Sequence, residues 1–584
     1  MNALQVTERN AMYALQTALP SIEGEALDLM VTSPQGAAKL RELILSLAVT
    51  GKLVRQAVKD GFATALLKQI ETQREYLVAC GKAKRGNKPP SISNDEPPFS
   101  IPNSWAWARI GELGSVVGGG TPKSQDPCLW ATDHEIPWLT PADLYALREK
   151  RIGRGRRDIT AAGLAGSSAQ LLPEGTVLFS SRAPIGYVAI AANALATNQG
   201  FKSCVPYLSE LADYLYWFLK QAGKAIDAAA SGTTFKEISG GKFAEVLVPL
   251  PPLAEQRRIV ARVEELMNLC DELEAHGRLQ DEQHARLVST LFNALVASES
   301  PQELAENWQR VASHFDLLLD RPGAVNALEQ TILQLAVRGL LVQQDPADEP
   351  TNELLARIDL TSGDKASRKK RGGDLARDGG DSKLAVLPRG WAWTTIESIA
   401  AVGTGTTPSR TNQAYFSPPL IPWVTSGETR QSFIAKTEQG VSPLALRETS
   451  LTVYPVGTLV IAMYGQGKTR GQISELQIEA TTNQACAAIV PTTNNLGHRR
   501  YLKLFFEKIY DEIRELAAGG AQPNLNVGKI KATLVPLPPL EEQRRIVARV
   551  EELRGLCTDL RKRLRQAQAT QSNLADALVA SAAA

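Results

Sequence analysis

The stretch LVPLPPLAEQRRIVARVEEL, residues 247–266, decides the fold because it returns almost unchanged as LVPLPPLEEQRRIVARVEEL at residues 534–553. Only Ala254 against Glu541 differs between the two copies. The proline-rich turn cannot continue a helix, whereas the Glu-Gln-Arg-Arg run after it is a strong helix former with apolar residues at helical spacing. Each copy therefore predicts a seam where one domain ends and a long helix begins.

The two seams belong to a repeat that occupies nearly the whole chain. LRELILSLAVTGKLV from residue 40 matches LEQTILQLAVRGLLV from residue 328. Trp-Ala-Trp, Ile-Pro-Trp and Thr-Asn-Gln triplets also recur in the same order, at residues 105 and 391, 136 and 421, and 197 and 482. All offsets lie between 285 and 288 residues. The pattern predicts a tandem duplication.

Within each copy, helical periodicity alternates with short apolar runs that glycine, proline and asparagine interrupt. The short runs indicate two mixed domains, each with a curved sheet, and a helix near residues 210–230 should cover the first. The predicted class is α+β. Five segments are expected: an N-terminal helical region and linker at 1–98, a mixed domain at 99–253, a helical spacer and linker at 254–386, a mixed domain at 387–540, and a C-terminal helix at 541–584. The polar run at 365–383 reads as a solvated tether.

The helices that follow the seams carry apolar residues spaced 3,4,3,4, which is typical of coiled-coil packing. We expect the two helices to pack on each other; the alternative is two independent surface helices. The expected seam residues are Val263, Leu266, Leu273, Leu287, Leu291, Val550, Leu553, Leu560, Leu564, Leu574 and Leu578.

Composition bounds the class of protein. The 64 Lys and Arg nearly balance the 62 Asp and Glu in 584 residues, so any anion-binding surface must come from local segregation of charge. Six scattered cysteines without a CxxC pair argue against a disulfide framework and a zinc site. The N-terminus has no signal pattern, and no apolar run approaches the ~20 residues that a membrane span needs. We expect a soluble, cytoplasmic protein.

Local basic segments favour contact with a nucleic-acid backbone, although a solvated surface loop is the alternative. Side chains that can form paired hydrogen bonds are the candidates for reading bases. The predicted DNA-binding residues are Arg148, Lys150, Arg151, Arg154, Arg156, Arg157, Arg182, Thr233, Thr234, Lys236, Gln466, Lys468, Arg470, Gln522, Asn524 and Asn526. Residues 499 and 500 are further arginines in the second domain. The Thr-Asn-Gln triplets recur in both copies, so we interpret them as structural.

Two domains that each open with a glycine-rich turn and an Ile-Pro-Trp triplet, and each close with PLPPLxEQRRIV, resemble the specificity subunit of type I restriction-modification enzymes. The resemblance covers nearly the full length. It implies two target-recognition domains, each reading one half of a bipartite, asymmetric DNA site. It also implies long helices that pair as an antiparallel coiled coil about a pseudo-twofold axis, set the gap between half-sites and dock two modification subunits. Restriction subunits, S-adenosylmethionine, ATP and Mg are then expected in the complex through other chains, with no cofactor on this one.

Catalytic motifs are not expected on this chain. AMYGQGKT at 462–469 resembles a phosphate-binding loop, but alanine stands where the first glycine is needed. Neither EPPF at 96–99 nor SPPL at 417–420 completes a methyltransferase motif, and the five histidines have no partner at metal-ligand spacing. The alternative function is a tandem protein-binding adaptor without DNA recognition, which the near-neutral net charge favours.

Overall fold

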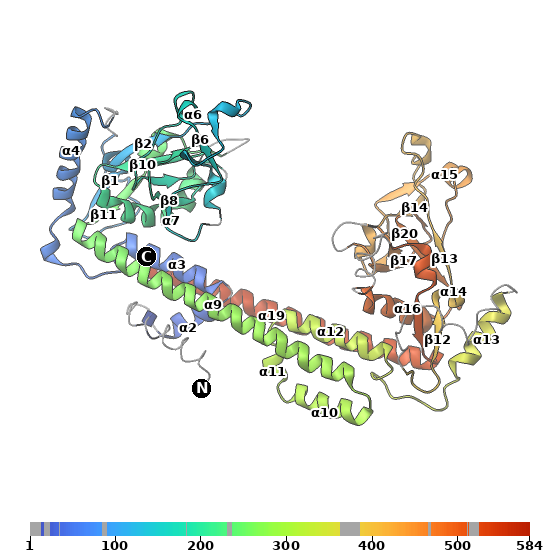
Figure 1. Ribbon diagram of the computed structural model, residues 1–584. Coiled ribbons are helices and arrows are strands. Elements are labelled where there is room, and N and C mark those ends of the chain that lie inside the picture. The colour runs from blue at the N-terminus through green and yellow to red at the C-terminus, as the bar shows by residue number, and fades with distance from the viewer. Residues whose placement is uncertain are drawn as a thin grey trace. The chain divides into compact units, whose positions relative to one another are not determined.

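The computed structural model describes residues 13, 15–16, 24–33, 35–83, 90–145, 147–182, 184–230, 236–362, 386–464, 469–510, 512 and 525–583 (Figure 1). It divides into two compact units. One contains Met1–Asp281 together with Ala567–Ala584, and the other contains Glu282–Gln566. The end of the last helix therefore belongs to the same unit as the N-terminal region.

In the first unit, helices precede and follow a mixed domain. They are α2 (Gly24–Thr32), α3 (Gly36–Val49), η1 (Val58–Asp60), α4 (Ala63–Ala79) and the start of α9 (Leu253–Ala297). The helical face predicted from residue 40 onward is confirmed, since Leu40, Leu43 and Leu47 are buried on α3.

The mixed domain of the first unit contains two sheets and a small antiparallel ribbon. Its strands are β1 (Ala106–Arg109), β2 (Gly114–Gly118), β3 (Trp130–Ala131), β4 (Ile136–Leu139), β5 (Arg151–Ile152), β6 (Arg157–Ile159), β7 (Val177–Phe179), β8 (Val188–Ala191), β9 (Ala196–Thr197), β10 (Lys202–Pro206) and β11 (Leu247–Leu250). Its helices are α5 (Ile110–Leu113), η2 (Pro127–Leu129), η3 (Pro141–Leu144), α6 (Ala161–Ala165), η4 (Ser209–Leu211), α7 (Ala212–Ala229) and α8 (Gly240–Ala244).

The two sheets replace the one curved sheet expected from the sequence. One has the order β2-β10-β7-β8-β5 and the other the order β3-β6-β4-β9, while β1 pairs with β11. Val177 and Phe179 of β7 share a core with α7, whereas Leu178 between them packs in a second core with Leu139 of β4. The five-stranded sheet is thus covered on both faces, which explains its continuous apolar runs. The predicted helix near 210–230 is confirmed as α7.

The second unit repeats this plan. Its strands are β12 (Ala392–Thr395), β13 (Ala400–Thr404), β14 (Ile421–Val424), β15 (Phe433–Ile434), β16 (Gln439–Val441), β17 (Leu459–Ala462), β18 (Ile473–Leu476), β19 (Thr481–Thr482), β20 (Cys486–Pro491) and β21 (Leu534–Leu537). Its helices are α10 (Pro301–Ala312), α11 (Phe315–Leu318), α12 (Pro322–Val337), α13 (Thr351–Ser362), α14 (Ile396–Ile399), η6 (Gln413–Tyr415), η7 (Glu428–Arg430), α15 (Pro443–Glu448), α16 (Leu496–Lys508), α18 (Val527–Lys531) and α19 (Leu540–Ala583). The sheets have the orders β13-β20-β17-β18-β15 and β16-β14-β19, and β12 pairs with β21.

The apolar stripes of α9 and α19 share a core in each unit, because Val263 of α9 lies with Ala575 of α19 and Phe292 of α9 lies with Cys557 of α19, but a shorter helix packs into each core as well. Val263 and Leu266 of α9 share a core with α3, and Val550 of α19 shares one with α12. The spacing predicts which residues share a face but not which helix covers that face.

The individual seam positions divide into three groups. The buried ones are Val263, Leu266, Leu273 and Val550, and the partly buried ones are Leu291, Leu553, Leu560, Leu564 and Leu578. At the equivalent positions Leu287 and Leu574 the prediction is wrong for the described chain, because these side chains are 52% and 50% exposed.

In each unit ion pairs join a short helix to a long helix. The short helix carries the positive charge in the first unit and the negative charge in the second. Arg41 of α3 contacts Asp271 and Glu274 of α9 at 2.5 and 2.7 Å. At the equivalent place in the second unit, Glu329 of α12 contacts Arg554 of α19 at 3.3 Å and also Arg561. The two copies therefore use reversed charges at matching positions.

No helix in the described part of the chain is both long and apolar enough to cross a membrane.

Candidate nucleic-acid interface

The Glu-Gln pair at the start of each long helix fixes that helix to its mixed domain. Glu542 is buried and accepts a hydrogen bond of 3.0 Å from the indole of Trp391. Burial raises the pKa of Glu542 to about 7. Gln543 donates to the carbonyl of Pro538 at 2.7 Å and lies 3.0 Å from His498. These contacts explain why a helix start would repeat a glutamate and a glutamine next to prolines.

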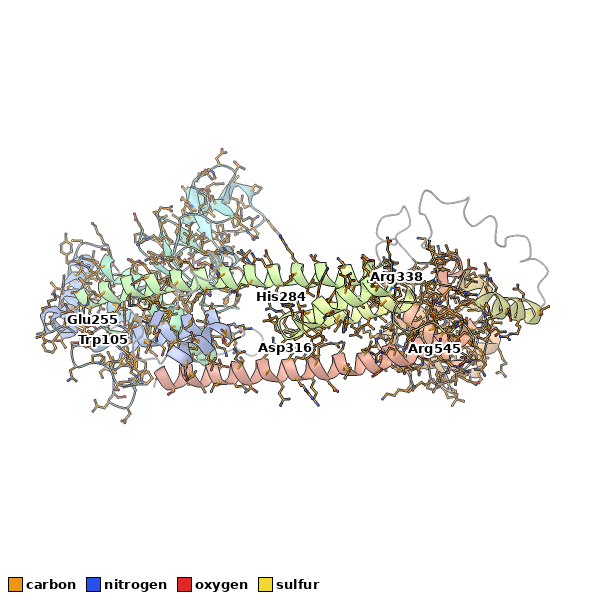
Figure 2. The ribbon with its side chains drawn as sticks, turned by 90° about the horizontal axis from the view of Figure 1, so that it is seen from below. Trp105, Glu255, His284, Asp316, Arg338 and Arg545 are labelled. Atoms are coloured by element: carbon orange, nitrogen blue, oxygen red, sulfur yellow. The ribbon has the colours of Figure 1, made fainter. Side chains whose placement is uncertain are left out.

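The first unit has a related arrangement with a different donor to the glutamate. Gln256 donates to the carbonyl of Pro251 at 2.9 Å, and buried Glu255 accepts from Gln56 at 2.6 Å. Trp105 and Glu255 lie at the same end of α9 in Figure 2. Buried polar contacts therefore hold the start of each long helix, on Trp391 of the mixed domain in the second unit and on Gln56 of the N-terminal region in the first.

The glycine-rich turn of each domain packs on the Thr-Asn-Gln turn, which supports the structural interpretation of those triplets. A Cβ atom on Gly119 would lie 2.3 Å from the carbonyl oxygen of Thr197, and one on Gly405 would lie 1.5 Å from that of Thr482. The amide side chain of Asn198 accepts from the backbone of residue 200 at 2.9 Å. Only glycine allows the two backbones to approach so closely.

Three of the six cations in the basic loop at 148–157 form ion pairs within the first unit. Lys150 contacts Asp213 of α7 at 2.8 Å and also Glu264 of α9. Burial alone would lower the pKa of Lys150, but these bonds raise the pKa above its ordinary value. Arg151 lies 3.6 Å from Asp213, and Arg154 pairs with the buried carboxylate of residue 158. These three cations therefore attach the loop to the body of the domain.

The other three cations of this loop face solvent. Arg148 and Arg156 are exposed, and within the described part of the chain neither has an acidic partner. Arg157 is exposed and stacks over the ring of Trp130, with its guanidinium carbon 4.6 Å from the ring centroid. Their charges are available to phosphate groups.

The remaining predicted residues of the first domain are partly engaged. Arg182 donates to Glu237 at 2.9 Å, and Lys236 lies 3.7 Å from Asp227. Both cations are exposed, so their pairs are weak in water. Thr233 and Thr234 lie outside the described residues.

Most candidates of the second domain either lie outside the described residues or have a structural contact. Gln466, Lys468, Gln522 and Asn524 are outside. Arg470 is half-buried and already interacts within the chain. Asn526 caps α18 by accepting from the backbone amide of Lys529 at 2.8 Å.

Arg499 and Arg500 also act within the second domain. Both bind the buried carboxylate of Glu475, at 2.8 Å each. Arg500 reaches Glu551 of α19 at 3.1 Å as well. Glu551 occupies the position that Glu264 has in α9, so each unit joins its domain to this acidic position with a cation from a different element.

The model of the "Type I restriction modification DNA specificity domain" matches residues 102–281 and, a second time, residues 388–569. This chain belongs to the type I restriction-modification DNA specificity family. Two relatives from Escherichia coli, the specificity subunits of the type I restriction enzymes EcoEI and EcoAI, are each 30% identical over 93% of this chain and 93% of their own length. The MjaIX specificity subunit of Methanocaldococcus jannaschii is 24% identical over 75% of this chain and 84% of its own length.

Two solved structures are also similar to this specificity chain. One comes from a study of complex assembly and conformational transition in the type I R-M system; it is 18% identical, covers 83% of this chain and 99% of its own, and has a TM-score of 0.49. The HsdS subunit from Thermoanaerobacter tengcongensis is 18% identical over 83% of this chain and 98% of its own, with a TM-score of 0.36. The sequence relatives confirm the expected non-catalytic specificity subunit and give no support to the protein-binding adaptor.

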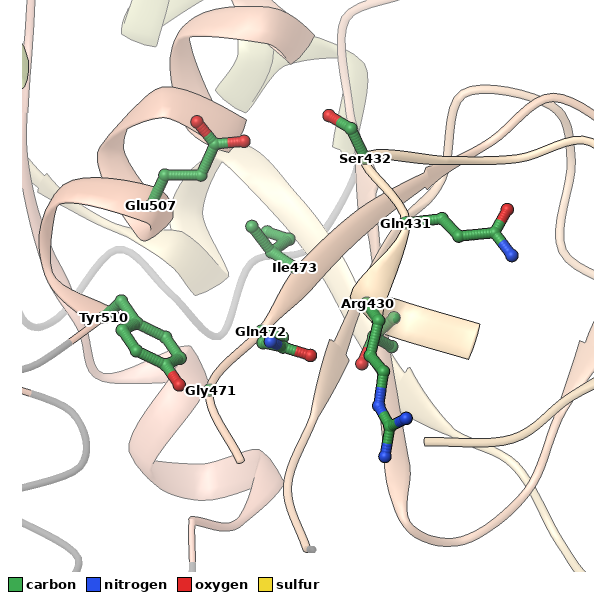
Figure 3. Close-up of a pocket in the computed structure, with 9 residues that line it drawn as sticks. Arg430, Gln431, Ser432, Gly471, Gln472, Ile473, Glu507 and Tyr510 are labelled. Atoms are coloured by element: carbon green, nitrogen blue, oxygen red, sulfur yellow. The ribbon is translucent and has the colours of Figure 1, made fainter. Parts of the chain in front are cut away.

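A shallow hollow in the second domain of the specificity chain has a volume of about 370 Å³ (Figure 3). Its wall includes Arg430, Gln472 and Tyr510. Glu507, also on the wall, is bound to Arg554 at 2.6 Å, so its charge is already matched within the unit. We assign no ligand to this hollow. Among the described residues no cluster of histidine, cysteine, aspartate and glutamate has the geometry of a metal site.

Exposed polar residues that the sequence did not single out follow each glycine-rich turn. They are residues 123–125 (Lys-Ser-Gln) and 409–411 (Ser-Arg-Thr). Aligning the two copies at an offset of 286 residues would have shown that Thr121 and Pro122 match Thr407 and Pro408, whereas the three residues after each proline differ.

Proposed function

We propose that the two mixed domains of this specificity chain each read one half of a bipartite, asymmetric DNA site. The observation that carries the proposal is that the two domains share a backbone architecture but differ in their exposed polar side chains. Both domains have the same strand order in their five-stranded sheets, a glycine-rich turn packed on a Thr-Asn-Gln turn and a long helix that begins at the same seam, but their exposed polar side chains differ. Two recognition domains with the same fold and different surface side chains suit a DNA site whose two halves have different sequences.

The long helices would fix the gap between the half-sites. α9 has 45 residues and α19 has 44, so each is roughly 65 to 70 Å long. A continuous helix is stiff enough to hold two reading surfaces at a set spacing. The equivalent leucines Leu287 and Leu574 are half exposed on these helices, and exposed apolar side chains suit protein contacts. Two equivalent positions of this kind support docking of two copies of one partner, the modification subunit.

The rest of the expected complex follows from the family. DNA and the other restriction-modification subunits are the partners of a specificity subunit. Two modification subunits, added restriction subunits, and S-adenosylmethionine, ATP and Mg bound by those chains form part of the proposal. The site of action is then the cytoplasm.

Methylation mapping in cells tests the function directly. Cells that express this chain with its cognate modification subunit should carry a split methylated motif, and cells that lack this chain should not. The motif gives both half-sites and the gap. If the subunits assemble and no motif appears, the DNA-reading proposal fails.

A further inference from the structure

The loop that follows the glycine-rich turn has the same backbone frame in both domains. It begins at a backbone hydrogen bond to the Thr-Asn-Gln turn. The amide of Gly120 donates to the carbonyl of Thr197 at 2.9 Å, and the amide of Thr406 donates to that of Thr482 at 3.1 Å. An indole then fixes the same carbonyl in each copy, from Trp138 to residue 120 at 2.9 Å and from Trp423 to residue 406 at 3.2 Å.

The far end of the loop is also held identically. The amide of Asp126 donates to the carbonyl of Lys123 at 3.2 Å, and the amide of Asn412 donates to that of Ser409 at 3.1 Å. The side chains of Asp126 and Asn412 cap the short helices η2 and η6, at 3.1 and 3.2 Å. Buried prolines at 122 and 408 close the near end. The backbone of the loop is therefore held without the side chains of residues 123–125 and 409–411.

The tips, residues 123–125 and 409–411, differ in sequence although their frames match. All six tip residues are exposed. Within the described part of the chain, the side chains of Lys123, Ser124, Gln125 and Arg410 have no hydrogen bond or ion pair. Ser409 and Thr411 bond only to each other, at 2.8 Å. Rigid loops that carry unpartnered polar side chains are pre-organised for a ligand, because little entropy is lost when they bind.

The first tip belongs to the same surface region as the solvent-facing cations. Strand β3, which follows the loop, pairs with β6, which ends the basic loop. Arg157 on β6 stacks over Trp130, and the indole of Trp130 donates to the carbonyl of Lys123 at 3.1 Å. An anionic duplex attracted by the arginines would thus meet the tip.

We propose that residues 123–125 and 409–411 contact the DNA and help to determine the base sequence read by their respective domains. This inference rests on the proposed function and names residues for it. Gln125 and Arg410 have the side chains that can form paired hydrogen bonds with adenine and guanine edges, while Lys123 can also bind a phosphate. The frame needs none of these side chains, so the tips are free to differ between copies.

Two triple substitutions in the full-length chain test the inference: Lys123→Ala/Ser124→Ala/Gln125→Ala in the first domain and Ser409→Ala/Arg410→Ala/Thr411→Ala in the second. Each variant is co-expressed with the modification subunit, and its methylated motif is mapped. The first variant should relax the half-site of the first domain and leave the other half-site unchanged, and the second variant should do the reverse. A lost base contact should reduce discrimination at that position by about 5- to 150-fold.

Each unaltered half-site is the internal control, and Lys68→Ala on α4 is a matched control for removing an exposed lysine. An unchanged motif at unchanged methylation in both triple variants overturns the tip proposal but leaves DNA reading intact. If a variant methylates nothing, the inference is tested by measuring how tightly its assembled complex binds DNA duplexes that each carry one base-pair change in the motif. Loss of discrimination in one half-site supports the proposal, whereas equal weakening for every duplex overturns it. A wild-type chain that yields no motif rejects the proposed function instead.

Discussion

At the scale of single residues, the cations of one basic loop have two different environments. Lys150 is held between carboxylates of α7 and α9, whereas Arg156 faces solvent. A cation whose charge is matched inside the protein stabilises the fold, and one that is unmatched can release counterions from DNA. Sequence proximity to other arginines therefore does not determine the role of a lysine.

This difference predicts opposite effects for two substitutions six residues apart. Arg156→Ala should leave the thermal midpoint unchanged, and if Arg156 contacts one phosphate it should reduce the slope of log affinity against log salt by about 0.9. Lys150→Ala should lower the free energy of unfolding by about 1 kcal/mol, because it leaves Asp213 and Glu264 without their shared partner. Thermal unfolding and DNA binding of the assembled complex at several salt concentrations measure both. A salt slope reduced only by Lys150→Ala would contradict this assignment.

At the scale of elements, reversed ion pairs distinguish two helices of similar sequence. If α3 docked on α19, Arg41 would meet Arg554 and Arg561. If α12 docked on α9, Glu329 would meet two carboxylates. Like charges disfavour these wrong pairings, which are the characteristic failure of tandem repeats. We infer that the charge reversal favours correct pairing as well as stability.

A variant whose ion pairs have the same charge order in both units separates the effect on correct pairing from the effect on stability. Arg41→Glu alone should cost about 1 kcal/mol, because the new side chain faces Asp271 and Glu274. Arg41→Glu/Asp271→Thr/Glu274→Arg should recover the thermal midpoint but give less monomer after refolding than wild type, since each short helix then suits both long helices. Size-exclusion chromatography after refolding measures the monomer.

The control for this test reverses an ion pair within one helix, Arg549→Glu/Glu552→Arg on α19. It should refold like wild type. Equal monomer yields for the triple variant and this control would show that the reversed pairs contribute stability alone.

At the scale of the whole molecule, α9 and α19 each contribute residues to both compact units. Each unit combines one long helix's start with the other's end, so the duplication is complete only when the N-terminal region and the C-terminal helix come together. A change in helix length should therefore act on the relation between the two reading domains and leave each domain's own structure intact.

Matched deletions of one heptad test the proposed role of the helices. Removing residues 277–283 and 564–570 together shortens each helix by about 10 Å and keeps its faces nearly in register. The expected result is a methylated motif with the same two half-sites and a different gap. A seven-residue deletion within 365–383 should leave the gap unchanged. An unchanged gap after the paired heptad deletion would show that the helices do not set the spacing.

The sequence by itself determined the tandem duplication, the α+β class, the starts of both long helices and the family. These properties rest on local rules: proline ends a helix, periodicity marks a buried face, and two nearly identical seams reveal a repeat. Leu40 and Leu47 on α3 were predictable as core residues for that reason.

Only the tertiary structure decided which element covers each face and which charge meets a partner. The first half of the α9 stripe packs with α3 and the second half with α12, and Lys150 is matched by Asp213 and Glu264, residues far from it in sequence. Residues 123–125 emerge as a candidate DNA contact only in the tertiary structure. Contacts with Thr197 and Trp138 hold the backbone of the loop while the side chains of these residues are free. Burial and charge pairing depend on distances through space, and a pattern along the chain does not contain those distances.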